Sequence, residues 1–288
     1  MGTVRAARVR HSPPTSRESP VSTFEAETPR PESVPTLTPR VAVVTGGARG
    51  LGQASAVRLA ERGYDVAIAD LIEPIETASA VRSAGARALP LRCDVAVPSD
   101  VTSTIKAVED KFRRCDVLVN NAGIYPLRAF RDLDLELWHR ILDVNLTSAF
   151  LFCKAVVPGM TDRQFGRIIN FTSNTVSLPV ESATHYITSK AAVIGFTRAL
   201  ASEVGKHGIT VNCVAPGATP TEGMLAGHDT PAAKEQRLQL FTNMIDRQAV
   251  KRISRLADIA DAVAWLASDE AAFVSAQTLV VDGGLVRM

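Results

Sequence analysis

The sequence predicts an α/β fold in which a doubly wound parallel sheet of seven strands carries helices on both faces. Three observations support this prediction. Seven short apolar runs rich in β-branched residues alternate with segments of helical periodicity. The runs are apolar almost without interruption, as in parallel strands that are buried on both faces. The chain has 288 residues, 46% of them hydrophobic, which is enough for one large core.

Each predicted strand except the last is followed by a helix. The strands are expected within "RVAVVTGG", "YDVAIAD", "ARALPLRCDV", "CDVLVNNAG", "GRIINFTS", "GITVNCVAPG" and "AQTLVVDGG". The helices are expected near 51–63, 73–84, 99–114, 135–160, 184–206 and 257–268. Because ligands of such sheets bind beyond the carboxyl ends of the strands, functional residues are expected directly after them.

Charge and cysteine content argue against several classes of protein. The net charge is +2 without a basic block, so neither nucleic acid nor a membrane surface is an expected partner. The four cysteines lie far apart without a CxxC or Cys/His cluster, so no disulfide and no metal site is expected. The longest uninterrupted apolar runs are too short to cross a bilayer, and no secretory signal opens the chain. A reducing, cytoplasmic setting fits best.

Residues 1–39 differ in composition from the rest of the chain. They are rich in proline, serine, threonine and arginine and have almost no periodic apolar pattern, which predicts a disordered tail. A transit peptide and an over-extended gene start are alternative interpretations of this segment. Residues 40–288 contain no second linker and are predicted to form one catalytic domain.

The segment "TGGARGLG", Thr45 to Gly52, lies between the first strand and its helix. Main-chain N–H groups and the helix dipole can hold a pyrophosphate there, although a tight turn needs glycine for conformational reasons alone. Asp70 closes the second strand 18 residues after Gly52, where a carboxylate can accept hydrogen bonds from ribose hydroxyls. A loop-initiating aspartate is the alternative.

The segment "YITSK" places Tyr186 and Lys190 four residues apart on one face of a predicted helix. Taken alone, this spacing favours a packed ring and a solvated lysine. His185, next to Tyr186, points about 100° away on a helix and is expected to pack or to line a pocket.

In context, the chain resembles the short-chain dehydrogenase/reductase family from about Arg40 to Met288. Glycine-turn and strand-end motifs agree in order: "TGGARGLG" with TGxxxGxG, "CDV" at 93–95, "NNAG" at 120–123, "YITSK" with YxxxK, "PGATPT" at 216–221 and "VDGG" near the end. Ser173 precedes Tyr186 by 13 residues, the usual interval of the family. The chain is similar to the single-domain branch that contains 3-oxoacyl-carrier-protein reductases and secondary alcohol dehydrogenases. A Rossmann-type fold is therefore implied.

The resemblance implies four catalytic residues. Tyr186 is expected to act as general acid or base on the substrate oxygen, with its pKa lowered by the Lys190 ammonium. Ser173 is expected to hydrogen-bond that oxygen. Lys190 is also expected to bind the nicotinamide ribose. Asn145 resembles the residue that holds a water linking Lys190 to solvent, and a buried asparagine at a helix kink is the alternative.

The resemblance also implies the residues that bind the cofactor. NAD is expected over NADP, because the Asp70 carboxylate repels a 2′-phosphate, while Arg49 partly restores tolerance of that phosphate. The expected cofactor-binding residues are Gly46, Arg49, Gly50, Leu51, Gly52, Asp70, Leu71, Asp94, Val95, Asn121, Ala122, Gly123, Tyr186, Lys190, Pro216, Gly217, Thr219 and Thr221.

The predicted function is hydride transfer between a nicotinamide cofactor and a secondary alcohol or ketone. The alternative is a catalytically silent dinucleotide-binding regulator, which the complete catalytic set argues against. A mobile lid is expected over 218–253. Apolar side chains of Tyr125, Leu178, Met224 and Leu225 suit a medium-sized hydrophobic substrate, whose identity stays open. The long helices near 135–160 and 184–206 resemble the pair that forms the family's dimer interface, so a homodimer or homotetramer is expected.

Overall fold

The computed structural model describes residues 2, 39–222, 235, 239 and 242–287. The tail expected over 1–39 lies outside the described residues except for Gly2 and Pro39. Part of the expected lid also lies outside them, including Met224 and Leu225.

The predicted seven-stranded parallel sheet is confirmed. All six strand pairs are parallel, and the strand order is β3-β2-β1-β4-β5-β6-β7. The order reverses beside β1, which is the switch point of a doubly wound sheet. The strands are β1 Val41–Thr45, β2 Asp65–Asp70, β3 Ala88–Arg92, β4 Val117–Asn120, β5 Gly166–Phe171, β6 Ile209–Pro216 and β7 Thr278–Val281.

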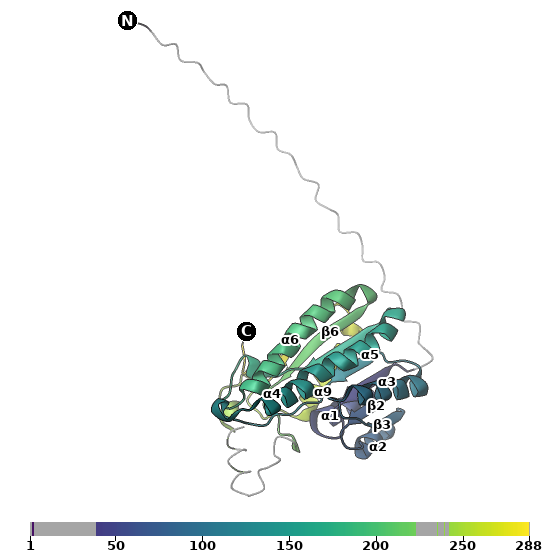
Figure 1. Ribbon diagram of the computed structural model, residues 1–288, viewed down its shortest axis with the longest axis horizontal. Coiled ribbons are helices and arrows are strands. Elements are labelled where there is room, and N and C mark those ends of the chain that lie inside the picture. The colour runs from purple at the N-terminus through teal and green to yellow at the C-terminus, as the bar shows by residue number, and fades with distance from the viewer. Residues whose placement is uncertain (1, 3–38, 223–234, 236–238, 240–241, 288) are drawn as a thin grey trace. The chain divides into compact units, whose positions relative to one another are not determined.

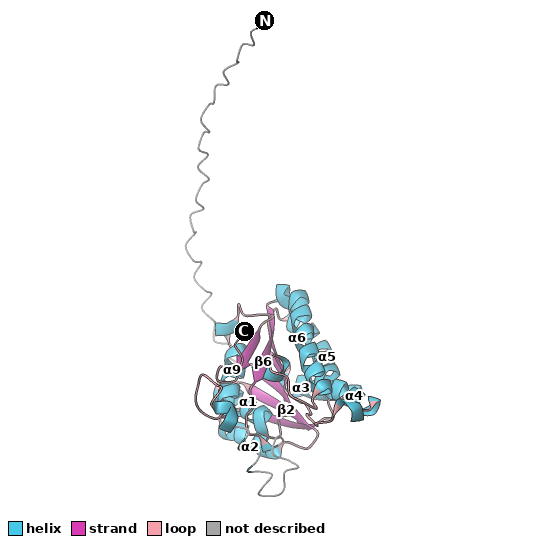
Figure 2. Cartoon of the chain, turned by 90° about the vertical axis from the view of Figure 1, so that its left-hand side faces the viewer, coloured by secondary structure: helices cyan, strands magenta, loops and turns pink. Residues whose placement is uncertain are grey.

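Helices cover both faces of this sheet (Figures 1 and 2). They are α1 Gly50–Glu61, α2 Ile75–Ser83, α3 Pro98–Phe112, α4 Leu135–Leu142, α5 Ser148–Asp162, α6 Thr184–Val204 and α9 Leu256–Ala267. Helices α1, α2 and α9 lie on one face, and α3, α5 and α6 lie on the other. Each expected helix is therefore present, with ends that lie within two residues of the prediction.

Side chains alternate between the two layers along β1. Val41 and Val43 pack in the core beneath α3, α5 and α6, whereas Ala42 and Val44 pack beneath α1, α2 and α9. All four are completely buried. This two-sided burial explains why the strands are apolar throughout instead of alternating with polar residues.

The long helix predicted near 135–160 is not uniform. Helices α4 and α5 are joined without a break by a π-helical turn, Asp143–Thr147. The stretch Leu135–Asp162 contains an 18-residue window with a mean hydropathy of 1.5, so it is long and apolar enough to pass as a membrane span. However, α5 packs on β4, β5 and α3, so the apolar side chains on its buried side form part of the protein core.

Candidate active site

The predicted site residues gather at the carboxyl ends of the strands. Helix α6 begins on this side of the sheet, after β5, and the glycine turn follows β1. All strands are parallel, so every strand end faces the same side. The site is thus assembled from segments far apart in the sequence.

The glycine turn leaves no room for side chains at two positions. A Cβ on Gly52 would lie 2.0 Å from the carbonyl oxygen of Gly46, and a Cβ on Gly46 would lie 2.8 Å from the Cα of Ala122. Gly46 also has a φ of +63°, which favours glycine. Steric need and backbone conformation therefore both require glycine here.

The expected cofactor-side residues of "NNAG" also brace this turn. The Asn121 side-chain amide donates to the carbonyl oxygens of Thr45 and Gly46 at 3.0 and 2.9 Å. The Thr45 hydroxyl accepts from the main-chain N–H groups of Asn121 and Ala122, both at 3.1 Å. These bonds tie the end of β4 to the end of β1.

Helix α1 begins at the turn without a side-chain cap. Arg49 is the N-cap residue and its side chain makes no capping hydrogen bond; the first turn carries no acidic residue. A helix N-terminus of this kind has unsatisfied N–H groups and a partial positive charge. Together with the close approach at Gly46 and Gly52, it fits the pyrophosphate of a dinucleotide.

Asp70 lies beside the same turn. One carboxylate oxygen accepts from the Ala48 N–H at 2.9 Å, and the other accepts from the Ile72 N–H at 3.3 Å. Leu71, the next residue, is 55% exposed. The carboxylate therefore shapes the turn and still lies at the strand end, where a ribose is expected.

One charged neighbour of Asp70 did not emerge from the sequence. Arg92 is paired with Asp70 in the register of β2 and β3, and its Nε donates to the carbonyl oxygen of Leu71 at 3.3 Å. Its position as the last residue of the third strand is the signal in the sequence that points to it, since ligands lie at strand ends. Arg92 thus places a guanidinium group near the end of β2, and the exposed Arg49 follows Ala48, whose N–H is bonded to Asp70.

Asp94 and Val95 follow β3. The Asp94 carboxylate accepts from the Ala96 N–H at 3.0 Å and lies 3.7 Å from the Arg140 guanidinium of α4. Val95 is buried in the core. Asp94 is thus held at the same edge of the sheet as Asp70.

The segment after β6 approaches the glycine turn. A Cβ on Gly50 would lie 3.5 Å from the side chain of Thr221, so these two segments face each other. Gly217, directly after Pro216, lies against Asp282, where a Cβ would be 2.6 Å from the Asp282 side chain. The buried Thr219 hydroxyl donates to Ser254 Oγ at 3.0 Å and so supports the loop from within.

Tyr186 and Lys190 lie in the first two turns of α6, as predicted from their spacing. Lys190 is 4% exposed, and its ammonium donates to the carbonyl oxygen of Phe171 at 2.8 Å. The ammonium nitrogen lies 5.9 Å from the centre of the Tyr186 ring. Both side chains therefore face the end of β5.

Two further predicted residues meet Lys190. A Cβ on Gly123 would lie 3.3 Å from Asn145 Oδ1 and 3.4 Å from Lys190 Nζ, so the three residues adjoin. Asn145 lies in the π-helical turn and is buried. Turns of this kind are frequent at functional sites, where the extra residue redirects a side chain.

Both ends of the Asn145 side-chain amide are hydrogen-bonded to protein atoms. Its Oδ1 accepts from the Ile124 N–H at 2.8 Å, and its Nδ2 donates to the Ile124 carbonyl at 3.1 Å and to Ser189 Oγ at 3.1 Å. Asn145 thus fastens the loop after β4 to both the π-helical turn and α6. A buried asparagine that only stabilises an irregular helix would make the same bonds, so they are compatible with both interpretations of Asn145.

Ser173 follows β5 and begins a short 3-10 turn. Its hydroxyl oxygen accepts from the Thr175 N–H at 3.2 Å and from the Thr175 hydroxyl at 2.9 Å. It also lies close enough to the Tyr186 phenol to lower the pKa of that phenol. The serine and the tyrosine therefore adjoin as the interval of 13 residues predicts.

The expected lowering of the Tyr186 pKa is wrong for this structure. Burial raises the pKa of Tyr186 to about 12, an effect that the Ser173 hydrogen bond opposes and nearby Tyr125 reinforces. Lys190 does not counter this shift, because it has already lost its proton at the pH where the phenol ionises. Burial also lowers the pKa of Lys190 to about 8.

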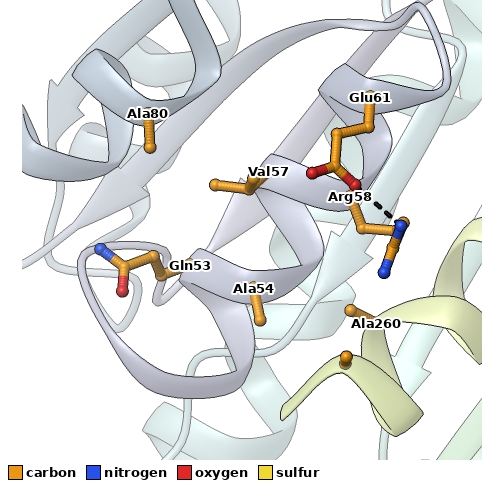
Figure 3. A pocket seen from close by; sticks show the side chains of 8 residues that line it. Gln53, Ala54, Val57, Arg58, Glu61, Ala80 and Ala260 are labelled. Carbon is orange, nitrogen blue, oxygen red and sulfur yellow. Dashed lines mark ion pairs between the residues drawn. The ribbon is translucent and has the colours of Figure 1, made fainter. Parts of the chain in front are cut away.

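A separate surface hollow of about 400 Å³ lies between α1, α2 and α9 (Figure 3). It is lined mainly by alanine and valine side chains, with the Arg58–Glu61 ion pair at its edge at 2.8 Å. None of the predicted site residues lines it. The expected chemistry is thus not located in this hollow.

The fold, the glycine turn and the Ser173–Tyr186–Lys190 group together define the class of dinucleotide-dependent oxidoreductases. A family model described as enoyl-(acyl carrier protein) reductase matches residues 46–286. The chain belongs to the short-chain dehydrogenase/reductase family. Members of this family use a nicotinamide cofactor and act on CH–OH groups or the corresponding carbonyls.

The chain aligns with nearly the whole length of individual relatives. The chain is 40% identical to the short-chain reductase protein NovJ of Streptomyces niveus, over 85% of this chain and 93% of the relative. It is 38% identical to the 3-oxoacyl-[acyl-carrier-protein] reductase FabG of Vibrio cholerae, over 85% and 97%. It is also 38% identical to the cis-4-hydroxycyclohexanecarboxylate dehydrogenase of Sinomonas cyclohexanicum, over 85% and 96%.

A solved structure confirms the fold. It is a candidate short-chain alcohol dehydrogenase from Sinorhizobium meliloti, 35% identical in sequence, with a TM-score of 0.80 over 86% of this chain and 97% of the other. The predicted family and fold are therefore both confirmed.

Proposed function

We propose that this enzyme interconverts a secondary alcohol and its ketone with NAD as the preferred cofactor and Tyr186 as the proton-exchanging residue. The observation that carries the proposal is the grouping of Ser173, Tyr186 and Lys190 at the end of β5, beside Gly123 and Asn145. A silent regulator has no need of a phenol placed beside a serine hydroxyl and a buried lysine.

The protonation states favour a role for Tyr186 as an acid. With a pKa of about 12, its phenol carries a proton at neutral pH and can donate it to an oxygen that becomes negative. The Ser173 hydroxyl, next to the phenol, can donate a second hydrogen bond to the same oxygen. We therefore propose ketone reduction as the direction these side chains serve best. In reverse, Tyr186 would accept the alcohol proton.

A bound nicotinamide cofactor would supply the hydride donor or acceptor. Gly46, Gly50 and Gly52 at the start of α1 would hold its pyrophosphate, and Asp70 would accept from its adenosine ribose. Lys190 and Gly123 would border the nicotinamide side. Pro216, Gly217, Thr219 and Thr221 would close that side from β6.

Preference for NAD rests on charge. The Asp70 carboxylate would repel the 2′-phosphate of NADP, whereas it can accept hydrogen bonds from the free hydroxyls of NAD. Arg49 and Arg92 oppose this effect as cations near the same strand end. Asp70 is expected to dominate because it is directly at the strand end and is fixed by the Ala48 and Ile72 N–H groups.

The substrate class is inferred from the wall of the site and the names of relatives. Tyr125 packs against Tyr186 and supplies apolar surface near the phenol, and Leu178 follows the turn that Ser173 begins. Relatives are named for a hydroxycyclohexanecarboxylate and for 3-oxoacyl groups. We propose a medium-sized, largely apolar secondary alcohol or ketone.

Assembly and location are proposed on separate grounds. Phe150 on α5 is 45% exposed, and Leu135 on α4 is 67% exposed, as expected if these helices meet a second copy. Light scattering should then report a dimer or tetramer rather than a single chain. The four free, buried cysteines suit a reducing cytoplasm.

A substrate panel tests the proposed function. The purified protein is assayed with NADH and NADPH against acetophenone, acetoacetyl-coenzyme A and 4-oxocyclohexanecarboxylate, with cofactor absorbance as the readout. Turnover of at least one ketone that is lost in Tyr186→Phe supports the proposal. Tight NADH binding without turnover of any carbonyl in a widened panel would support the regulator instead.

A further inference from the structure

The loop after β4, residues 124–128, is fastened to the catalytic region at three points. The Asn145 amide pairs with both main-chain groups of Ile124, at 2.8 and 3.1 Å. The Pro126 carbonyl oxygen accepts from His185 Nε2 at 2.9 Å. The Arg128 N–H donates to the Ser182 carbonyl at 2.7 Å. The main chain on both sides of Tyr125 is therefore held.

His185 is suited to this task by its burial. Its side chain is completely buried, immediately before Tyr186 in the first turn of α6. A carbonyl oxygen can only accept, so Nε2 carries the proton in this bond. Nδ1 is buried without a hydrogen-bond partner among the described residues. His185 thus commits one nitrogen to holding the loop, which explains a buried histidine beside the catalytic tyrosine.

The loop brings the Tyr125 ring against the Tyr186 ring. The ring centres lie 4.4 Å apart and the planes are inclined by 64°, an edge-to-face contact. The Lys190 ammonium donates to the Phe171 carbonyl and lies 5.9 Å from the centre of the Tyr186 ring. The Tyr125 ring is therefore the nearer side-chain contact that orients the Tyr186 ring.

We propose that Tyr125 is a positioning residue, which holds the Tyr186 ring in the orientation needed for proton transfer through an edge-to-face contact. This inference rests on the proposed function, in which Tyr186 exchanges a proton with substrate. It assigns His185 and Asn145 a shared task, since both fix the loop that carries Tyr125.

Proton transfer makes the orientation of the phenol important. A general acid must lie within hydrogen-bond reach of the substrate oxygen, about 2.6–3.2 Å. A small displacement of a catalytic group lowers the rate far more than it lowers binding. Tyr125→Leu keeps an apolar side chain in the wall of the site but loses the ring contact, so this replacement should lower kcat and leave KM nearly unchanged.

The test compares Tyr125→Leu with Tyr125→Phe, using the best ketone from the panel of acetophenone, acetoacetyl-coenzyme A and 4-oxocyclohexanecarboxylate. We expect Tyr125→Leu to lower kcat about tenfold with KM within about twofold, and Tyr125→Phe to restore kcat to within about twofold, because the ring is retained. Leu127→Ala, an exposed change in the same loop, is the control and should leave both constants unchanged.

Two results would overturn the inference. If Tyr125→Leu raises KM alone, the ring merely lines the pocket. If Tyr125→Phe loses as much kcat as Tyr125→Leu, the hydroxyl and not the ring contact matters. Circular dichroism establishes that each variant is folded. NADH binding, measured by the change in tryptophan fluorescence, establishes that the cofactor site is intact.

Two variants of His185 test the hydrogen bond that holds the loop at Pro126. His185→Leu removes the donor to the Pro126 carbonyl, whereas the amide of His185→Gln can still donate to it. We expect a fall in kcat of about threefold to tenfold for leucine and partial recovery for glutamine. An unchanged kcat in His185→Leu would show that the fastening is not needed.

Tyr186→Phe separates failure of this inference from failure of the proposed function. If Tyr186→Phe keeps full turnover, the proposed function itself is wrong. If Tyr186→Phe is inactive while Tyr125→Leu has unmodified kcat and KM, the proposed function stands and only the role of Tyr125 is wrong.

Discussion

The Lys190 ammonium donates to the main-chain carbonyl oxygen of Phe171 at 2.8 Å, on the inner side of α6. This bond anchors the first turns of the helix to the end of β5. Burial lowers the pKa of Lys190 to about 8 and raises the pKa of the Tyr186 phenol to about 12, so the lysine has lost its charge at the pH where the phenol ionises. Both groups therefore depend on burial for their protonation.

The two shifted groups predict opposite effects of pH on stability. The pKa of Lys190 is lowered to about 8 from 10.5, so the unfolded chain binds more protons between these values and the free energy of unfolding should rise with pH there. The pKa of Tyr186 is raised to about 12 from 10.0, so its contribution is lost as pH rises between these values.

Chemical denaturation from pH 7 to 11 checks this prediction in Lys190→Met and Tyr186→Phe. Lys190→Met should lack the rise between pH 8 and 10.5. That rise amounts to about 2–3 kcal/mol in the unmodified protein. Tyr186→Phe should reduce the fall above pH 10. Buried cysteines also contribute to that fall, so each curve is compared with that of the unmodified protein. If the free energy of unfolding changes with pH in the same way in the variants and in the unmodified protein, the pKa shifts of Lys190 and Tyr186 are wrong.

Catalysis should distinguish the three polar side chains of the site. We expect Tyr186→Phe to lose at least about a hundredfold in kcat while NADH binding is retained, because only the proton-transfer group is removed. Ser173→Ala should mainly lower kcat, by about tenfold to a hundredfold. Steady-state kinetics and fluorescence titration with NADH provide both readouts.

Lys190 should behave differently from both. Lys190→Ala removes a buried cation and its bond to Phe171, so turnover, cofactor affinity and stability should all fall. A variant with normal NADH affinity and normal turnover would show that this lysine only packs the helix against the sheet.

A change at Gly52 should disrupt the glycine turn. A Cβ at this position would lie 2.0 Å from the Gly46 carbonyl oxygen, which is backbone and cannot swing aside. Gly52→Ala should therefore weaken NADH binding at least about tenfold and lower the free energy of unfolding by more than about 2 kcal/mol.

The matched control is Gly205→Ala. Gly205 is exposed and has a φ of −56°, and a Cβ on it would meet no atom within 4 Å. Its replacement should change neither NADH affinity nor stability by a measurable amount. Equal effects of the two substitutions would show that the close contact at Gly52 is not what matters.

The arrangement of the strands was predictable because each strand is a short, continuously apolar run that ends in a polar or glycine-rich turn. In a parallel sheet all those ends meet at one edge, so Gly46, Asp70, Gly123 and Ser173 could be placed together from the sequence. Their proximity follows from topology alone.

The protonation of Tyr186 was not predictable, because it depends on how far tertiary packing buries the phenol and the lysine beside it. Helical spacing places the two residues on one face but does not reveal the Phe171 carbonyl. The π-helical turn at Asn145 was likewise hidden, since its sequence continues the apolar helical pattern on either side. Tyr125 reaches Tyr186 only through a loop whose path is set by tertiary hydrogen bonds.

Cofactor choice should depend on the balance between Asp70 and two neighbouring arginines. Asp70→Asn removes the carboxylate charge and keeps an oxygen that can accept from the Ala48 N–H, so the turn should stay intact. Without the repulsion of a 2′-phosphate, the ratio of kcat/KM for NADPH to that for NADH should rise about tenfold or more. Arg49→Ala is the matched opposite change, and it should lower NADPH affinity while leaving NADH affinity within about twofold. Titration of both reduced cofactors by fluorescence gives the same comparison without turnover. If the unmodified enzyme prefers NADPH by tenfold or more, the cations at Arg49 and Arg92 outweigh Asp70, and the proposed NAD preference is wrong.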